Sequence, residues 1–213
     1  MLHKETVAPQ TLELLKQLMS DRHLDGFFLV GGTALSLQIG HRISVDIDLF
    51  IQEPFDENKL SEYLEVKSGW QLNYLDRNTI KGQINTVQVD FITHAYPLIK
   101  NLLVVENIRI ASLEDIAAMK LNAVIGNGTR LKDFIDIAFL SVHLSLKQMI
   151  DAYEEKYKSK NPVMALKALE YHKDINYNEP IRLIPGAYKW DSIGHRLNEM
   201  VKAADKIFSN YPL

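Results

Sequence analysis

The stretch from Phe28 to Phe50 limits the fold of this chain more than any other part; it reads FLVGGTALSLQIGHRISVDIDLF. It starts with an apolar run typical of a buried strand, which Gly31 and Gly32 interrupt before a helix that ends near Gly40. Glycines at such a turn let the backbone approach a ligand closely, and the free N–H groups of a helix N-terminus favour a phosphate. We therefore expect a strand–turn–helix unit that can hold a phosphate, although a glycine pair alone often forms only a turn.

Two aspartates follow the glycines, Asp46 and Asp48, in a strand predicted over 44–51. Residues two apart on a strand have side chains on the same face, and two carboxylates so close repel each other unless a hard divalent cation lies between them. A third acid, Asp90, ends an apolar strand-like run. If that strand lies beside the first, three acids can hold two Mg²⁺ ions. The alternative for Asp90 is an acid that caps a turn.

The pattern of the remaining chain predicts an α+β part over residues 1–110, followed by a helical part over 111–213. In the first part we expect helices over 9–24, 33–40 and 56–66, strands over 27–30, 44–51, 70–74, 86–93 and 104–110, and a turn over 77–83. In the second part we expect helices over 112–125, 130–143, 146–159, 162–172 and 190–208, the first of them with Ser112 as its N-cap.

Composition excludes several classes of protein and site. The chain has no cysteine, which excludes disulfides and thiolate zinc sites. A net charge of −3 provides no general basic field for nucleic acid, and no apolar run reaches the ~20 residues of a membrane span. Because the N-terminus also lacks a secretory signal, we expect a cytoplasmic protein. We interpret Lys156, Lys158 and Lys160 as a solvated helix end, with an RNA backbone as the alternative contact.

The glycine pair followed by Asp46-x-Asp48 resembles the pattern of the nucleotidyltransferase superfamily. More narrowly, GGTAL together with Arg42-x-Ser44-x-Asp46-x-Asp48-Leu-Phe is similar to the AbiEii/AbiGii toxin family. Two later segments are also similar to motifs of that family: LEDIAAMKLNA, which contains Lys120, and RLKDFID over 130–136. Together these motifs cover roughly residues 25–140 of the chain.

The resemblance implies a fold and an activity. The expected fold is a nucleotidyltransferase-type mixed sheet with flanking helices, followed by a helical C-terminal part packed on it. The expected activity uses Mg²⁺ (or Mn²⁺) and a nucleoside triphosphate (NTP), and transfers a nucleotide to an acceptor, which in relatives is tRNA. Relatives act as toxins of two-gene systems, so a cognate antitoxin protein is an expected partner. We expect no association with a membrane.

The resemblance also implies roles for individual residues. The phosphate-binding turn would consist of Gly31, Gly32 and Thr33. The metal ligands would be Asp46, Asp48 and Asp90, and Asp90 would also help to deprotonate the acceptor. Lys120 would contact the triphosphate, and Asp133 would orient either Lys120 or the acceptor. Arg42 and Ser44 either contact the nucleotide or cap the strand and pair with the carboxylates.

Structural alternatives stand beside two of these roles. Lys120 fits a lysine at the edge of an apolar helix face, with its ammonium in solvent. Asp133 and Asp136, three apart on one helical face, fit an ion pair with Arg130 or Lys132. Two other functions also remain open: an NTP-dependent phosphotransferase acting on a protein or small molecule, and a degenerate module that binds a nucleotide or partner without catalysis.

Overall fold

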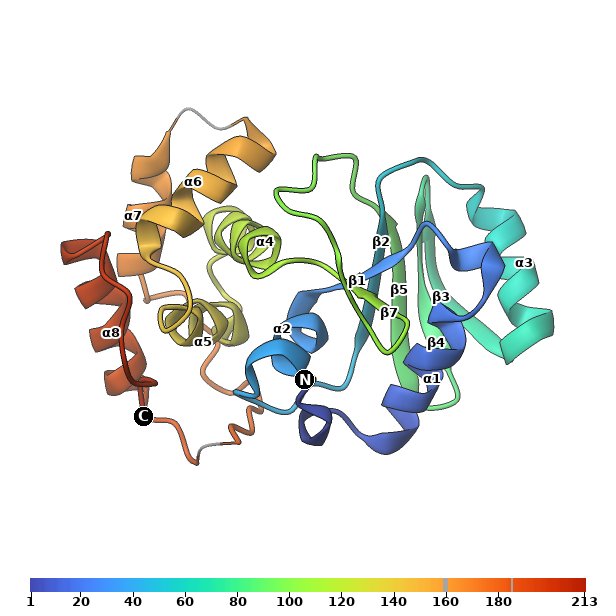
Figure 1. Cartoon of the computed structure of the whole chain (residues 1–213), viewed down its shortest axis with the longest axis horizontal. Coiled ribbons are helices and arrows are strands. Elements are labelled where there is room, and N and C mark those ends of the chain that lie inside the picture. Colours follow the sequence, from blue (N-terminus) through green and yellow to red (C-terminus); the bar gives the residue numbers. More distant parts are fainter. Residues whose placement is uncertain (159–160, 185) are drawn as a thin grey trace. The chain divides into compact units, whose positions relative to one another are not determined.

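The chain divides into two compact units in the computed structural model, which describes residues 1–158, 161–184 and 186–213 (Figure 1). Unit 1 comprises Met1–Pro97 and Asn101–Ala111, and contains a seven-stranded sheet among its described residues. Unit 2 comprises Leu98–Lys100 and Ser112–Leu213, and its regular elements are helices. The predicted α+β class with a helical C-terminal part is therefore confirmed.

The sheet of unit 1 is mixed, as expected. Its strands are β1 (Phe28–Val30), β2 (Ile47–Ile51), β3 (Trp70–Asp76), β4 (Thr79–Ile84), β5 (Val87–Thr93), β6 (Leu103–Val105) and β7 (Ile108–Ile110). They lie in the order β3-β4-β5-β2-β1-β7-β6. The pairs β2–β5 and β1–β7 are parallel, and the other neighbours are antiparallel.

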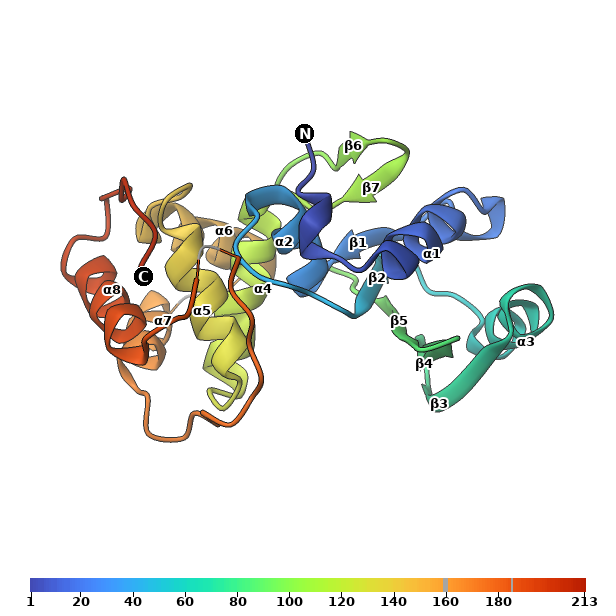
Figure 2. The same cartoon turned by 90° about the horizontal axis from the view of Figure 1, so that it is seen from below.

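Helices pack on this sheet at defined places. Unit 1 contains η1 (Lys4–Thr6), α1 (Pro9–Met19), η2 (Arg22–Leu24), α2 (Gly31–Ile39) and α3 (Glu57–Ser68). Helix α1 has a proline in its first turn, where no N–H bond is lost, and it packs against β7. Asp56 caps α3 by accepting a hydrogen bond from the backbone N–H of Lys59. Helix α3 packs against β3 and β4, beside which it lies in Figure 2.

The two faces of the sheet differ in polarity because side chains alternate along each strand. One face contributes buried apolar residues to the core of unit 1: Leu29, Ile47, Leu49, Trp70, Ile80, Ile84, Val87, Val89 and Phe91. Trp70 contacts Phe91 edge-on, with ring centroids 5.7 Å apart. The opposite face, which we call the polar face, carries one row of charged side chains: Asp48 on β2, Asp90 on β5 and Lys81 on β4.

Strand β4 corrects the prediction of a turn over residues 77–83. The turns are instead the two-residue connections after β3 and β4, where Asn78 and Asn85 have φ of 57° and 55°. Gly82 lies inside β4, where an added Cβ would be 2.8 Å from the Trp70 ring and would overlap the backbone oxygen of Gln71. This glycine therefore makes room for a buried tryptophan and does not mark a turn.

The segment 104–110 is a hairpin, so the prediction of a single strand there was wrong. Glu106 and Asn107 have φ of 52° and 63° and connect β6 to β7. Two consecutive residues with positive φ match the two-residue turns whose twist suits a tight antiparallel hairpin. The apolar residues on both sides of this turn concealed it in the sequence.

Unit 2 is built around α4. Its helices are α4 (Leu113–Gly126), α5 (Leu131–Leu140), α6 (Leu146–Tyr157), α7 (Pro162–Glu170) and α8 (Trp190–Lys202), so the last ends earlier than predicted. Helix α4 packs on α5, α6 and α7, and α8 packs on α5 and α7. Ser112 caps α4 by accepting the backbone N–H of Asp115, as expected. Among the described residues, no helix combines the length and apolar character that crossing a membrane requires.

A buried ion pair joins α4 to α6 and overturns the interpretation of Lys156 as solvated. Its Nζ lies 2.8 Å from Oδ1 of Asp115, and both side chains have an exposed fraction of 0%. The same carboxylate accepts the backbone N–H groups of Ile99 and Lys100. Lys158 is exposed at the end of α6, and Lys160 lies outside the described residues.

Candidate functional site

The junction of β1 and α2 brings the backbone against a carboxylate, and Gly31 and Gly32 are the first two residues of the helix rather than a turn before it. Gly31 has a φ of +71°, a conformation that L side chains rarely adopt, and a Cβ there would overlap Oδ2 of Asp48. The β1–β2 register explains this contact, because Val30 lies opposite Asp48. Glycine is therefore required at position 31 both for the backbone conformation and for the close approach of Asp48. The turn and the carboxylate form a single site.

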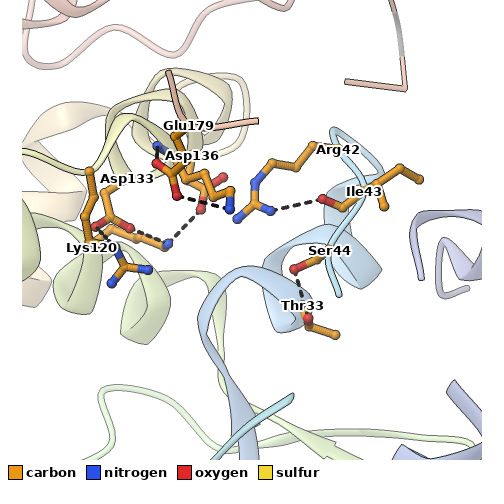
Figure 3. A network of polar contacts seen from close by, with 10 residues as sticks. Thr33, Arg42, Ile43, Ser44, Lys120, Asp133, Asp136 and Glu179 are labelled. Carbon is orange, nitrogen blue, oxygen red and sulfur yellow. Dashed lines mark hydrogen bonds and ion pairs between the residues drawn. The ribbon is translucent and has the colours of Figure 1, made fainter. Parts of the chain in front are cut away.

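Buried polar side chains hold the segment that leads to Asp46 (Figure 3). The hydroxyl of Thr33 lies 2.9 Å from Oγ of Ser44 and also contacts the backbone oxygen of Asp46. A carbonyl can only accept, so Thr33 donates to Asp46 and accepts from Ser44. Arg42 donates from Nη1 to the backbone oxygen of Ile43 at 3.1 Å. These contacts do not decide between the two roles of Arg42 and Ser44, so a role toward nucleotide and a pairing with the carboxylates both stay predictions.

Gly32 fits the same packing arrangement. A Cβ on Gly32 would overlap the Arg42 guanidinium and would lie 3.2 Å from Oγ of Ser44. Arg42 and Ser44 are both buried, as is Thr33. The second glycine therefore leaves room for the buried side chains that support the loop before β2.

Of the three aspartates, Asp48 lies at the start of β2 and Asp90 in the middle of β5. Asp48 and Asp90 are register partners on parallel neighbouring strands, which is the adjacency that a shared metal site needs. Asp46 lies just before β2, with an exposed side chain. Within residues 1–158, 161–184 and 186–213, no group of three or more His, Cys, Asp or Glu side chains is placed to hold a metal ion. The metal role of all three acids stays a prediction.

Lys81 is a neighbour of this site that sequence reasoning missed. Its Nζ lies 2.6 Å from Oδ2 of Asp90, across the β4–β5 pair. A signal was present, because Thr79, Lys81 and Gln83 alternate with buried residues, but interpreting the segment as a turn hid it. The carboxylate donors are of the kind that Mg²⁺ and Mn²⁺ prefer, so their chemistry fits a divalent ion. Such an ion has to share or take Asp90 from the ammonium of Lys81.

The later motifs form a second polar cluster, within unit 2. Lys120 on α4 places Nζ 2.6 Å from Oδ1 of Asp133 and 2.7 Å from Oδ2 of Asp136, both on α5 (Figure 3). The two acids are three residues apart, on one face of the helix. The exposed fractions of the three side chains are 9%, 2% and 0%. Lys120 is therefore not a solvent-facing lysine, and that alternative is wrong.

The alternative, an ion pair of these acids with Arg130 or Lys132, is present only in part. Lys132 pairs with Glu179 at 3.0 Å, and Arg130 reaches Oδ2 of Asp133 only at 3.7 Å. Among the described residues, this Asp133 oxygen is buried without a hydrogen-bond partner. Asp136, which sequence reasoning treated as structural, lies as close to Lys120 as Asp133 does. The cluster fixes the position of the Lys120 ammonium, as an orienting role of Asp133 requires.

Comparisons with known proteins show relatives in sequence and in fold. A relative from Aquifex aeolicus (strain VF5), the uncharacterized protein aq_aa25, is 32% identical over 168 residues, which cover 76% of this chain and 81% of that protein. The crystal structure of JHP933 from Helicobacter pylori shares the fold, with a TM-score of 0.55 and 21% identity over 93% of each chain. Another H. pylori structure, of a protein assigned as a nucleotidyltransferase, has a TM-score of 0.58 and 20% identity over 93% of this chain and 96% of that one.

The family itself follows from a sequence model that covers most of the chain. The model of the nucleotidyl transferase AbiEii toxin, of type IV toxin–antitoxin systems, matches residues 13–69 and 67–189. These ranges include the glycine turn, all three aspartates and the Lys120 cluster. The chain therefore belongs to the AbiEii nucleotidyltransferase family.

Proposed function

We propose that this protein transfers a nucleotide from an NTP to a hydroxyl of tRNA, depends on Mg²⁺ or Mn²⁺, and acts as a toxin that a cognate antitoxin neutralises. The observation that carries the chemistry is the contact of the Gly31 turn with Asp48, whose register partner is Asp90. A phosphate-binding turn and two neighbouring carboxylates in one place suit a metal-bound triphosphate. The toxin and the tRNA acceptor rest on the family alone.

The proposed reaction joins an acceptor oxygen to the α-phosphorus of the NTP and breaks its bond to the β-phosphate, so that pyrophosphate leaves. Asp46, Asp48 and Asp90 would hold the divalent ions, which would activate the acceptor oxygen and offset charge on the leaving group. Asp90 would accept the proton of the acceptor hydroxyl. The backbone N–H groups of the Gly31–Thr33 turn would donate to phosphate oxygens, at the start of a helix where anions are favoured.

Lys120 would contact the triphosphate in this proposal. Its ammonium is buried between Asp133 and Asp136, which hold it in one position. The role of Lys120 toward the triphosphate rests on the family motif that contains it.

A labelled-nucleotide assay with a matched pair of variants tests the proposal. Purified protein, Mg²⁺, total tRNA and each α-³²P-labelled NTP in turn would be separated on a denaturing gel. We expect label on RNA for the wild type and for Asp76→Asn, an exposed acid at the far end of β3. Asp48→Asn should reduce the label by at least ~100-fold, because it removes a charged ligand from the reacting site. Equal labelling by Asp48→Asn and Asp76→Asn would contradict the proposed site.

The same two variants address the toxin role. Induced expression of the wild type and of Asp76→Asn should arrest the growth of a bacterial host that lacks the antitoxin, whereas Asp48→Asn should not. Growth arrest by all three proteins would mean that any toxicity does not depend on the transfer reaction.

A further inference from the structure

Lys81 occupies a place in the row of residues that crosses the polar face. The strand registers pair Lys81 with Asp90, and Asp90 in turn with Asp48. The Nζ–Oδ2 distance of 2.6 Å to Asp90 is that of a short charge-assisted hydrogen bond. The side chains of Lys81 and Asp90 are 43% and 22% exposed, so this pair is more open to solvent than the Lys120 cluster.

The ammonium of Lys81 and a divalent cation both need the carboxylate of Asp90. A carboxylate has two oxygens, so both cations can touch it, but their positive charges then repel each other at close range. Lysine has a flexible four-carbon stem and three rotatable N–H donors, so its ammonium can leave the carboxylate without a change in the backbone. The structure thus shows Asp90 paired with a cation on a flexible side chain.

A metal-bound NTP changes this balance because it brings several negative charges to the same site. Without nucleotide, a divalent ion has to displace Lys81 or accept its repulsion, and either one weakens binding. With nucleotide, the negative charge of the polyphosphate offsets the positive charge of the Lys81 ammonium, which no longer pairs with Asp90. If the divalent ion and the NTP both bind better once Lys81 has left Asp90, they bind cooperatively. Each then raises the affinity for the other by the same factor.

We propose that Lys81 is a positioning residue that couples metal binding to nucleotide binding by holding Asp90 until a metal-bound nucleotide arrives. The inference rests on the proposed function and adds to it an order of events. The divalent ion binds weakly to the protein alone and tightly together with the NTP. Lys67, an exposed lysine on α3, serves as the control.

The test measures the affinity of the full chain for Mn²⁺ by electron paramagnetic resonance. The measurement is made with and without a non-hydrolysable α,β-methylene NTP analogue. Lys81→Gln should bind Mn²⁺ alone roughly three- to tenfold more tightly than the wild type, because it removes a competing charge at a half-exposed site. It should also show a smaller gain in affinity on adding the analogue. Lys81→Arg, which keeps the charge, and Lys67→Gln, which removes a distant one, should resemble the wild type.

Asp90→Asn shows whether the effect passes through the carboxylate. In that background Lys81→Gln should lose most of its effect on Mn²⁺ affinity, because the group for which the cations compete has been neutralised. Lys81→Met serves as a second neutral variant, and cooperative thermal unfolding of each protein confirms that it is folded.

Two outcomes overturn the inference and differ in what else they affect. If Lys81→Gln and Lys67→Gln bind Mn²⁺ equally, with equal gains from the analogue, Lys81 does not couple the ligands, and the proposed transfer reaction stands on its own assay. If the wild type binds neither Mn²⁺ nor the analogue, and transfers no label, both the inference and the proposed function fail.

Discussion

Replacing Gly31 by alanine separates the two reasons for glycine at the β1–α2 turn. The backbone φ of +71° is one reason, and an L residue in this region costs roughly 1–2 kcal/mol of folding free energy. The second is the carboxylate of Asp48, because the new Cβ would lie 3.0 Å from Cγ of Asp48 and would overlap its Oδ2. Ordinary contacts of a Cβ begin near 3.4 Å, so the carboxylate has to move by about 1 Å.

The expected result is a modest loss of stability together with a large loss of activity. Misplacing a reacting group by about 1 Å can lower the rate ~100-fold. Gly69→Ala is the matched control, because Gly69 has a φ of +65° and nothing within 4 Å of its added Cβ. Both variants should lose roughly 1–2 kcal/mol in urea unfolding. Only Gly31→Ala should lose nucleotide transfer in the labelled-NTP assay.

The comparison has a clear contrary result. If both alanine variants transfer nucleotide at the same fraction of the wild-type rate, the contact of the Gly31 turn with Asp48 does not matter for the reaction. The site would then have to lie elsewhere in the chain, and the central geometric argument would fail.

The remaining predictions concern the buried ion pairs of unit 2. Lys120→Met removes the ammonium that lies 2.6 Å and 2.7 Å from the buried carboxylates of Asp133 and Asp136, so we expect a loss of ~3–5 kcal/mol in urea unfolding together with loss of transfer. Lys156→Met should cost ~3 kcal/mol by the same measurement, because Asp115 keeps hydrogen bonds from two backbone N–H groups. Lys158→Met, at an exposed position, should change stability by less than about 0.5 kcal/mol, and a loss equal to that of Lys156→Met would refute the distinction between them.

The strand–turn–helix unit was predictable because its signals are local. An apolar run, a glycine pair and a helical pattern follow one another in the sequence, and both β1 and α2 form, although α2 begins at Gly31, two residues before the predicted start. The adjacency of Asp48 and Asp90 was harder to predict from the sequence. The parallel pairing of β2 with β5 joins segments about forty residues apart and depends on the whole sheet. It was anticipated only because an acid on an apolar strand needs a reason.

The errors came from residues whose role depends on distant partners. Residues 77–83 were predicted as a turn, yet Gly82 among them is a strand residue that accommodates Trp70, and this error hid both β4 and Lys81. Lys156 follows two glutamates and looks solvated, but its partner Asp115 lies 41 positions earlier on another helix. Sequence proximity indicates local hydrogen bonds and caps, whereas burial is determined by packing between helices.

The measurement that tests the account most directly is the position of the label that the wild-type protein transfers. Parallel reactions with α-³²P and γ-³²P NTP, each beside Asp48→Asn, distinguish a nucleotide from a phosphate as the transferred group. The account predicts that the acceptor gains label from the α-labelled NTP alone, and only with the wild-type protein. Transfer of the γ label would identify a phosphotransferase, and transfer by Asp48→Asn at the wild-type rate would contradict the site itself.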